Sequence, residues 1–123
     1  MADESANPEF LATDILAQAE HDPNASCFLV TDSKDLALKT DEFVRKLTKV
    51  APRREIIEES LSKSGKIIIT DTFDEAIHVT NEYAPEHLII STKDDDETLS
   101  HIKNAGSIFL QVSKHLKILN LHC

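Results

Sequence analysis

Two residues able to move protons stand side by side at Glu86 and His87, within the stretch Tyr83 to Leu88 (YAPEHL). Proline fixes its own backbone and restricts the residue before it, so Ala84-Pro85 predicts a fixed corner that presents the pair from a defined position. A histidine titrates near neutral pH, and an adjacent carboxylate can orient or activate it. The pair therefore suits general acid–base chemistry on an alcohol or a water. Adjacent Glu and His also occur often by chance.

A second pair of polar residues, Gln18 and His21, lies three residues apart in a predicted helix over residues 8–21. Side chains at this spacing project from one helix face, and Asp14 shares the same stripe. Taken alone, Gln18 and His21 read as ordinary surface residues and Asp14 as a solvated carboxylate. Their spacing alone does not assign them a chemical role.

Charge and hydropathy narrow the classes of partner. The net charge is −9, from 22 acidic against 13 basic residues, without a Lys/Arg cluster. This composition disfavours binding to nucleic acid or to anionic membranes. The first residues lack a basic flank and an apolar core, and no apolar run approaches the length of a spanning helix, so we expect a cytoplasmic protein.

Cysteine and glycine usage excludes further site types. Cys27 and Cys123 match no metal-ligand spacing and are expected to stay reduced. The two glycines, Gly65 and Gly106, cannot form a G-x-G-x-x-G turn or a phosphate-binding loop within this segment. If a nucleotide takes part in the reaction, its phosphates must be held elsewhere.

The elements that must position these residues alternate between helices and strands. Caps and apolar spacing predict helices over residues 8–21, from about 34 to 50, and over 53–64, 73–83 and 98–103. Apolar runs predict strands at residues 27–31, 66–70, 88–91 and 107–110. We expect an α/β fold, with a mostly parallel sheet and helices on both faces. Residues 93–97 are expected to be a solvated acidic turn and helix start. In the tail, Val112, Leu116, Ile118 and Leu119 recur at near-helical spacing and would form an apolar stripe.

Five short stretches resemble motifs of one enzyme family in their order and separations: residues 6–10 (ANPEF), 18–21 (QAEH), 52–56 (PRREI), 83–88 (YAPEHL) and 104–110 (NAGSIFL). Together they resemble histidinol dehydrogenase over residues 2–110. That resemblance implies an incomplete Rossmann-like domain of a larger, dimeric enzyme. It also implies an activity that uses NAD and zinc to oxidise L-histidinol to L-histidine through the aldehyde, in histidine biosynthesis.

The resemblance implies roles for both polar pairs. Gln18 and His21 would be zinc ligands, His87 the general base, and Glu86 the residue that activates the water attacking the aldehyde. All four would belong to the substrate site, and we expect the pairs to approach each other, since a base must reach the metal-bound alcohol. No residue of this chain is assigned to NAD.

The departures from the family matter as much as the match. Family members carry a section before this segment that holds much of the nicotinamide site, and one after it that supplies an Asp and a His as further zinc ligands. Here Gln111 replaces a family glycine. We therefore expect residues 1–110 to be part of the zinc- and substrate-binding domain, and residues 111–123 to be a divergent tail. The isolated chain is expected to be an inactive fragment; the alternative is a non-catalytic interaction protein that keeps the domain fold.

Overall fold

The computed structural model describes residues 1–21, 27–85, 87–112 and 115–120. Contacts between residues divide the chain into two compact units. We call Asn7–Leu29 with Lys34–Ile68 the helical unit, and Met1–Ala6, Val30–Ser33 and Ile69–Cys123 the sheet unit. Within the described residues, no helix combines the length and the apolarity needed to cross a membrane.

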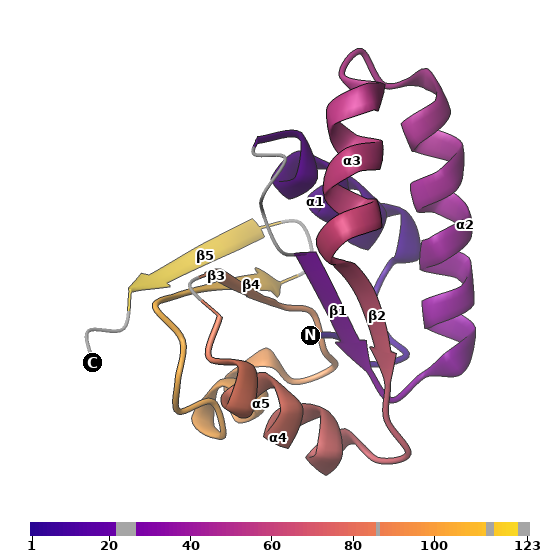
Figure 1. The fold of residues 1–123 in the computed structure, drawn as a ribbon. Helices are drawn as coiled ribbons and strands as arrows, with labels where there is room; N and C mark the ends of the chain where they lie inside the picture. Colours follow the sequence, from indigo (N-terminus) through magenta and orange to yellow (C-terminus); the bar gives the residue numbers. More distant parts are fainter. Residues whose placement is uncertain (22–26, 86, 113–114, 121–123) are drawn as a thin grey trace. The chain divides into compact units, whose positions relative to one another are not determined.

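The helical unit is built from α1 (Pro8–His21), α2 (Lys34–Val50) and α3 (Arg54–Ser64), which pack against one another (Figure 1). Most of β1 (Cys27–Thr31) and β2 (Gly65–Ile69) also belongs to this unit, where the two strands pair and run in the same direction. The core gathers buried and half-buried apolar side chains from all three helices, the turn between α2 and α3, and β1: Ile15, Leu16, Ala19, Cys27, Val44, Leu47, Ala51, Ile57 and Leu61. Each large side chain that is fully buried contributes about 1.5–3 kcal/mol.

Gly65 ends α3 and begins β2 in a single step. Its N–H donates to the carbonyl of Leu61, while its backbone is already extended at φ −81°. The glycine is needed for space rather than for a left-handed conformation, because a Cβ here would lie 2.8 Å from the Leu61 oxygen. Helix α3 thus ends at Ser64, as the predicted range 53–64 has it, and the glycine that follows is required by its close approach to the preceding helical turn.

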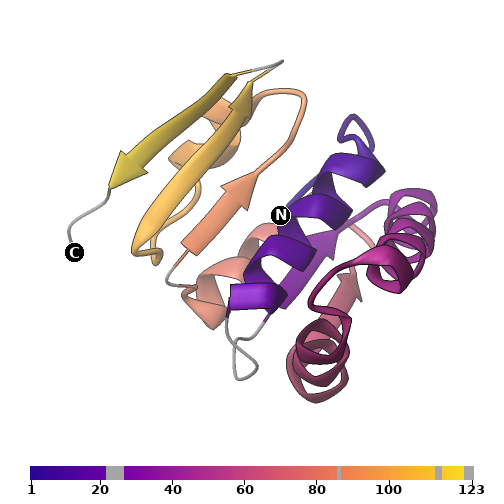
Figure 2. The ribbon, with the colours of Figure 1, turned by 90° about the horizontal axis from the view of Figure 1, so that it is seen from above.

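The sheet unit contains β3 (His87–Ile90), β4 (Ser107–Val112) and β5 (His115–Asn120), which lie side by side in Figure 2. The pair β3–β4 is parallel and the pair β4–β5 is antiparallel. Two helices, α4 (Phe73–Tyr83) and α5 (Asp95–Ser100), complete the unit, and α5 packs against β3 and β4. Its buried apolar side chains include Ala76, Leu88, Ile90, Ile102, Ile108 and Leu110. The α/β fold with parallel strands is confirmed, with one antiparallel strand added at an edge.

The first residues of the chain bridge two strand ends inside the sheet unit. Ala2, which is fully buried, forms parallel bridges with both Thr31 and Ser91. Its N–H donates to the Val30 carbonyl at 3.0 Å, and the Ser91 N–H donates to the Met1 carbonyl at 3.1 Å. This segment therefore satisfies backbone groups that would otherwise be unpaired at the ends of β1 and β3.

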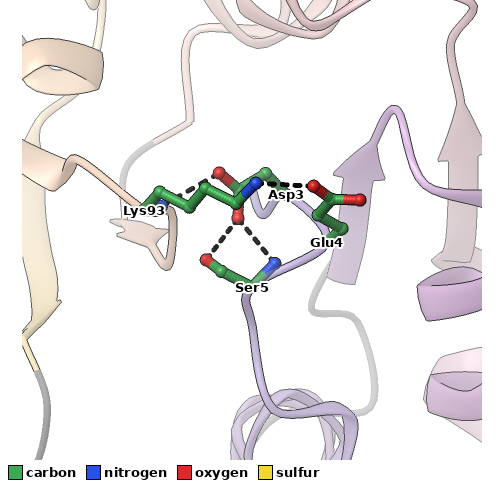
Figure 3. Close-up of polar contacts among 4 residues, drawn as sticks. All are labelled: Asp3, Glu4, Ser5 and Lys93. Atoms are coloured by element: carbon green, nitrogen blue, oxygen red, sulfur yellow. Dashed lines mark hydrogen bonds and ion pairs between the residues drawn. The ribbon is translucent and has the colours of Figure 1, made fainter.

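A polar clamp holds this segment in place (Figure 3). One oxygen of the Asp3 carboxylate accepts from the backbone N–H of Lys93 at 2.9 Å, and the other accepts from the N–H of Ser5 at 2.9 Å. The ammonium of Lys93 reaches Glu4 at 2.6 Å. The hydrogen bond and the charge of Glu4 raise the pKa of Lys93 above its usual value, so the lysine is a cation throughout the physiological range.

The acidic run begins a helix, as predicted, but it is not solvated throughout. Helix α5 begins three residues earlier than predicted, because the Asp94 side chain accepts from the N–H of Glu97 and caps it. Asp95 is buried at 8% exposure, and its carboxylate accepts both the N–H and the hydroxyl of Thr92. A carboxylate so bonded can be buried in a position where an unpaired one would face water.

The near-helical spacing of apolar residues in the tail does not correspond to a helix. Residues 115–120 form β5, whose partners run from Val112↔His115 to Ser107↔Asn120 along β4. The reason is nonlocal: β4 has β3 on one side only, and its other edge offers N–H and C=O groups that a returning strand can pair. The backbone pairing with β4 therefore decides the structure of this segment, and the apolar spacing that it shares with a helix does not.

Candidate active site

Helix α4 leads into the corner Ala84-Pro85 before His87, and hydrogen bonds define both ends of the helix. At its start the Thr72 hydroxyl accepts from the N–H of Glu75 at 3.2 Å, as the predicted cap requires. At its end Ala84 adopts a left-handed conformation, with φ 50° and ψ 62°, and its N–H donates to the Thr80 carbonyl. A non-glycine residue in this region costs roughly 1–2 kcal/mol. Such strain persists only where the surrounding contacts hold the backbone in place.

His87 is the first residue of β3, which begins one residue before the predicted strand 88–91, and its side chain is exposed. In the parallel register it lies opposite Ser107, and the residue before that pair, Gly106, donates its N–H to the Pro85 carbonyl at 3.1 Å. The imidazole therefore extends from a strand that is held in register as soon as it begins. Glu86, the predicted partner, lies outside the described residues.

Gln18 and His21 both lie on α1, on consecutive turns near its C-terminal end. The helix starts where predicted, because the Asn7 side chain accepts from the N–H groups of Glu9 and Phe10. The Gln18 side chain is exposed, and His21 is the last helical residue. The three-residue spacing that can aim two donors at one point is therefore present in the helix.

Asp14, on the same stripe of α1, departs from the expectation of a solvated carboxylate because it is half-buried. The two candidate pairs belong to different units, since Gln18 and His21 lie in the helical unit and His87 in the sheet unit. Their predicted approach to one another stays a prediction.

The donor set decides how well this chain alone suits a zinc ion. A catalytic zinc normally has three protein ligands and an open position. Gln18 and His21 offer one amide oxygen and one imidazole. Among the described residues, no group of three or more His, Cys, Asp or Glu side chains could hold a metal ion. The described part of the chain therefore fits a share of a zinc site and does not complete one.

Asn81 was missed from the sequence. Its side chain, in the last turn of α4, is bonded to backbone groups of residues 101–103, twenty residues further along the chain. The available signal was its residue type, because Asn is a poor helix former whose amide competes with the backbone. Nothing in the sequence indicates which distant backbone groups that amide would find.

Comparison with known proteins decides the family. The model of the histidinol dehydrogenase family matches residues 1–116. The chain belongs to the histidinol dehydrogenase family. The match contains every candidate site residue and extends beyond residue 110, where the resemblance in sequence motifs ended.

Individual relatives agree with that assignment. Histidinol dehydrogenase from Methanothermobacter thermautotrophicus is 56% identical over 110 residues, which is 89% of this chain and 26% of the relative. The enzyme of the same name from Methanococcus maripaludis is 52% identical over the same shares. A crystal structure of histidinol dehydrogenase from Elizabethkingia anophelis superposes with a TM-score of 0.85 at 37% identity, over 89% of this chain and 25% of that one. The chain thus spans about a quarter of the length of its relatives.

Proposed function

We propose that this chain is a segment of a histidinol dehydrogenase that oxidises L-histidinol to L-histidine with NAD, and that it carries part of the zinc and substrate site. The observation that supports this most strongly is the family match over residues 1–116, which contains the YAPEHL corner with His87 exposed at the start of β3. The resemblance further suggests a homodimeric, cytoplasmic enzyme when the polypeptide is full length.

In this proposal His87 acts as the general base. Its imidazole would accept the hydroxyl proton of the alcohol, and NAD, when bound, would supply the hydride acceptor for this step. Glu86 would then take a proton from the water that adds to the aldehyde, and a second NAD would be the acceptor as the hydrate is oxidised to the carboxylate. One acid–base pair can serve both oxidations, because each needs a proton removed from an oxygen on the same carbon.

Gln18 and His21 would hold the zinc together with the Asp and the His that the family resemblance places in a later section of the enzyme. When bound, the ion lowers the pKa of the substrate hydroxyl and fixes the substrate amino alcohol in place. The contribution of this chain is to present both donors from consecutive turns of a capped helix.

We infer that a polypeptide of residues 1–123 alone binds zinc weakly and does not turn over histidinol. Two donors are fewer than a catalytic zinc uses, and a neutral amide oxygen is a weak ligand for this ion. Positioning of reacting groups supplies roughly 7–11 kcal/mol in well-oriented reactions, and a loosely held substrate loses that contribution.

Calorimetry and an activity assay test this inference. Zinc is titrated into the chain and into Gln18→Ala and His21→Ala, with Thr13→Ala as the control, because Thr13 is exposed on α1 and off the Gln18 stripe. We expect weak binding that falls further in the two site variants and is unchanged in the control. Tight binding by the chain, or any NADH formation from histidinol, would show that it completes its own site.

Complementation tests the proposed function itself. Residues 1–110 of this chain replace the matching segment of the full-length Methanothermobacter thermautotrophicus enzyme. The hybrid is expressed in a strain that cannot make histidine. We expect growth with the hybrid, and loss of growth with His87→Ala. No growth with a folded, soluble hybrid would favour the non-catalytic interaction protein instead.

A further inference from the structure

The amide of Asn81 is bonded on both of its sides. Its nitrogen donates to the His101 carbonyl at 3.0 Å, and its oxygen accepts from the N–H of Lys103 at 2.7 Å. The two backbone groups flank Ile102, whose side chain is buried in the sheet unit. Asn81 therefore ties the last turn of α4 to the backbone that follows α5.

The segment that follows α5 stays hydrogen-bonded to the end of α4 as far as the corner Ala84-Pro85. The side chain of Asn104 donates to the Asn81 carbonyl at 3.3 Å, and the N–H of Gly106 donates to the Pro85 carbonyl at 3.1 Å. The next residues begin the parallel pairing of β3 with β4, where His87 lies opposite Ser107. A row of hydrogen bonds thus runs from Asn81 to the register position of His87.

This row matters because the corner is strained. Ala84 is the one non-glycine residue with a positive φ in the described part of the chain, and it precedes a proline, which disfavours a free choice of conformation. Without contacts on the far side, the backbone between α4 and β3 could relax to a less costly conformation. Such a change would move the point from which His87 extends.

The amide is chemically suited to this task. Asn offers a donor and an acceptor on one short side chain, so it satisfies a carbonyl and an N–H together. Asp would keep the acceptor for Lys103 but would place a second oxygen against the His101 carbonyl. Ala would lose both bonds, although it is the better helix former by up to about 0.7 kcal/mol.

We propose that Asn81 is a positioning residue for His87, acting through the backbone of residues 101–106. The proposal rests on the proposed function, in which His87 is the general base. Asn81 itself takes no part in proton transfer.

The test uses kinetics in the hybrid full-length enzyme described above. We expect Asn81→Ala and Asn81→Asp to lower kcat about 10- to 100-fold, since a displacement of about 1 Å can cost 10²-fold, while KM changes little. The control is Glu82→Ala, because Glu82 is the next residue of α4 and its side chain is 73% exposed. A purely structural role for Asn81 would lower the yield or the melting temperature and leave kcat per folded enzyme unchanged, which would overturn the proposal.

Hydrogen exchange in the 123-residue chain gives an independent readout. In Asn81→Ala we expect faster exchange of the amides of Lys103 and Gly106 and a changed resonance of the His87 imidazole, while the Thr80 amide inside α4 keeps its protection. Unchanged exchange at Gly106 with an unchanged His87 signal would overturn the proposal. Loss of protection throughout α4 would also overturn it, because Asn81 would then be needed for the helix itself.

The two measurements separate the two proposals. If the unsubstituted hybrid is folded but inactive, the proposed function fails, and hydrogen exchange still shows whether Asn81 controls the position of His87. If the hybrid is active and Asn81→Ala keeps its kcat, the proposed function stands and the positioning role fails.

Discussion

Replacing Gly65 by Ala should destabilise the helical unit, although alanine is compatible with the backbone angle found there. The added Cβ would lie 2.8 Å from the Leu61 oxygen and 2.9 Å from both its Cα and its Cδ2. Two of these atoms belong to the backbone of α3 and cannot rotate away. Overpacking costs about 1–3 kcal/mol, and the lower flexibility of the unfolded chain returns about 0.4–1 kcal/mol. We expect a net loss of about 1–2 kcal/mol.

Urea unfolding followed by circular dichroism measures this loss as a lower midpoint at an unchanged slope. Ser62→Ala is the matched control, because Ser62 is exposed on the same helical turn, and it should leave stability within about 0.5 kcal/mol. Leu61→Ala removes the Cδ2 contact and leaves both backbone contacts, and it carries its own cost because Leu61 packs in the core. In the Leu61→Ala background, Gly65→Ala should therefore still cost part of the free energy that it costs in the parent. A Gly65→Ala chain as stable as the parent would refute the argument that this glycine is required for space.

Three further predictions concern single residues. Ala84→Gly should stabilise the chain by about 0.5–1 kcal/mol by relieving the left-handed strain, whereas Ala84→Val should destabilise it, as urea midpoints would show. Asp95→Ala should cost about 1–3 kcal/mol, because it leaves the N–H of Thr92 without its acceptor; a midpoint equal to that of the parent would contradict this. Burial raises the pKa of Cys27, so the unfolded thiol ionises first, and stability should be unaffected at neutral pH but fall as pH rises above about 9. Cys27→Ala should lose that part of the pH dependence in parallel urea titrations, and an identical dependence in both proteins would argue against a buried thiol.

The elements predicted well from the sequence are those with local causes. Helix α1 starts at Pro8 because Asn7 caps it, and α4 spans the predicted residues because Thr72 caps it. The strand at Cys27–Thr31 was predicted to the residue from its apolar run. In each case the deciding interaction joins residues at most a few positions apart, so the sequence contains it.

The elements predicted poorly depend on distant partners. Strand β5 exists through its antiparallel pairing with β4. The candidate site shows the same difference between local and distant causes. The place of His87 at the start of a strand could be predicted from the proline corner, but the bonds of Asn81 to residues 101–103 join segments about twenty residues apart and could not.

This difference between local and distant causes implies how substitutions should separate in their effects. The beginning of α4 is secured by its own cap, whereas its end is secured by residues 101–106, where Ile102 and Ala105 are buried. Loss of the hydrogen bonds between residues 101–106 and the end of α4 should make the corner Ala84-Pro85 mobile without unfolding the helix, because the hydrogen bonds inside α4 remain. Changes that remove a hydrogen bond between these residues and α4, such as Asn104→Ala, should therefore reduce the proposed catalysis more than stability. Changes in the core of the helical unit, such as Ile57→Ala, should instead cost about 2–5 kcal/mol of stability and leave the geometry of His87 in the folded molecules unaltered.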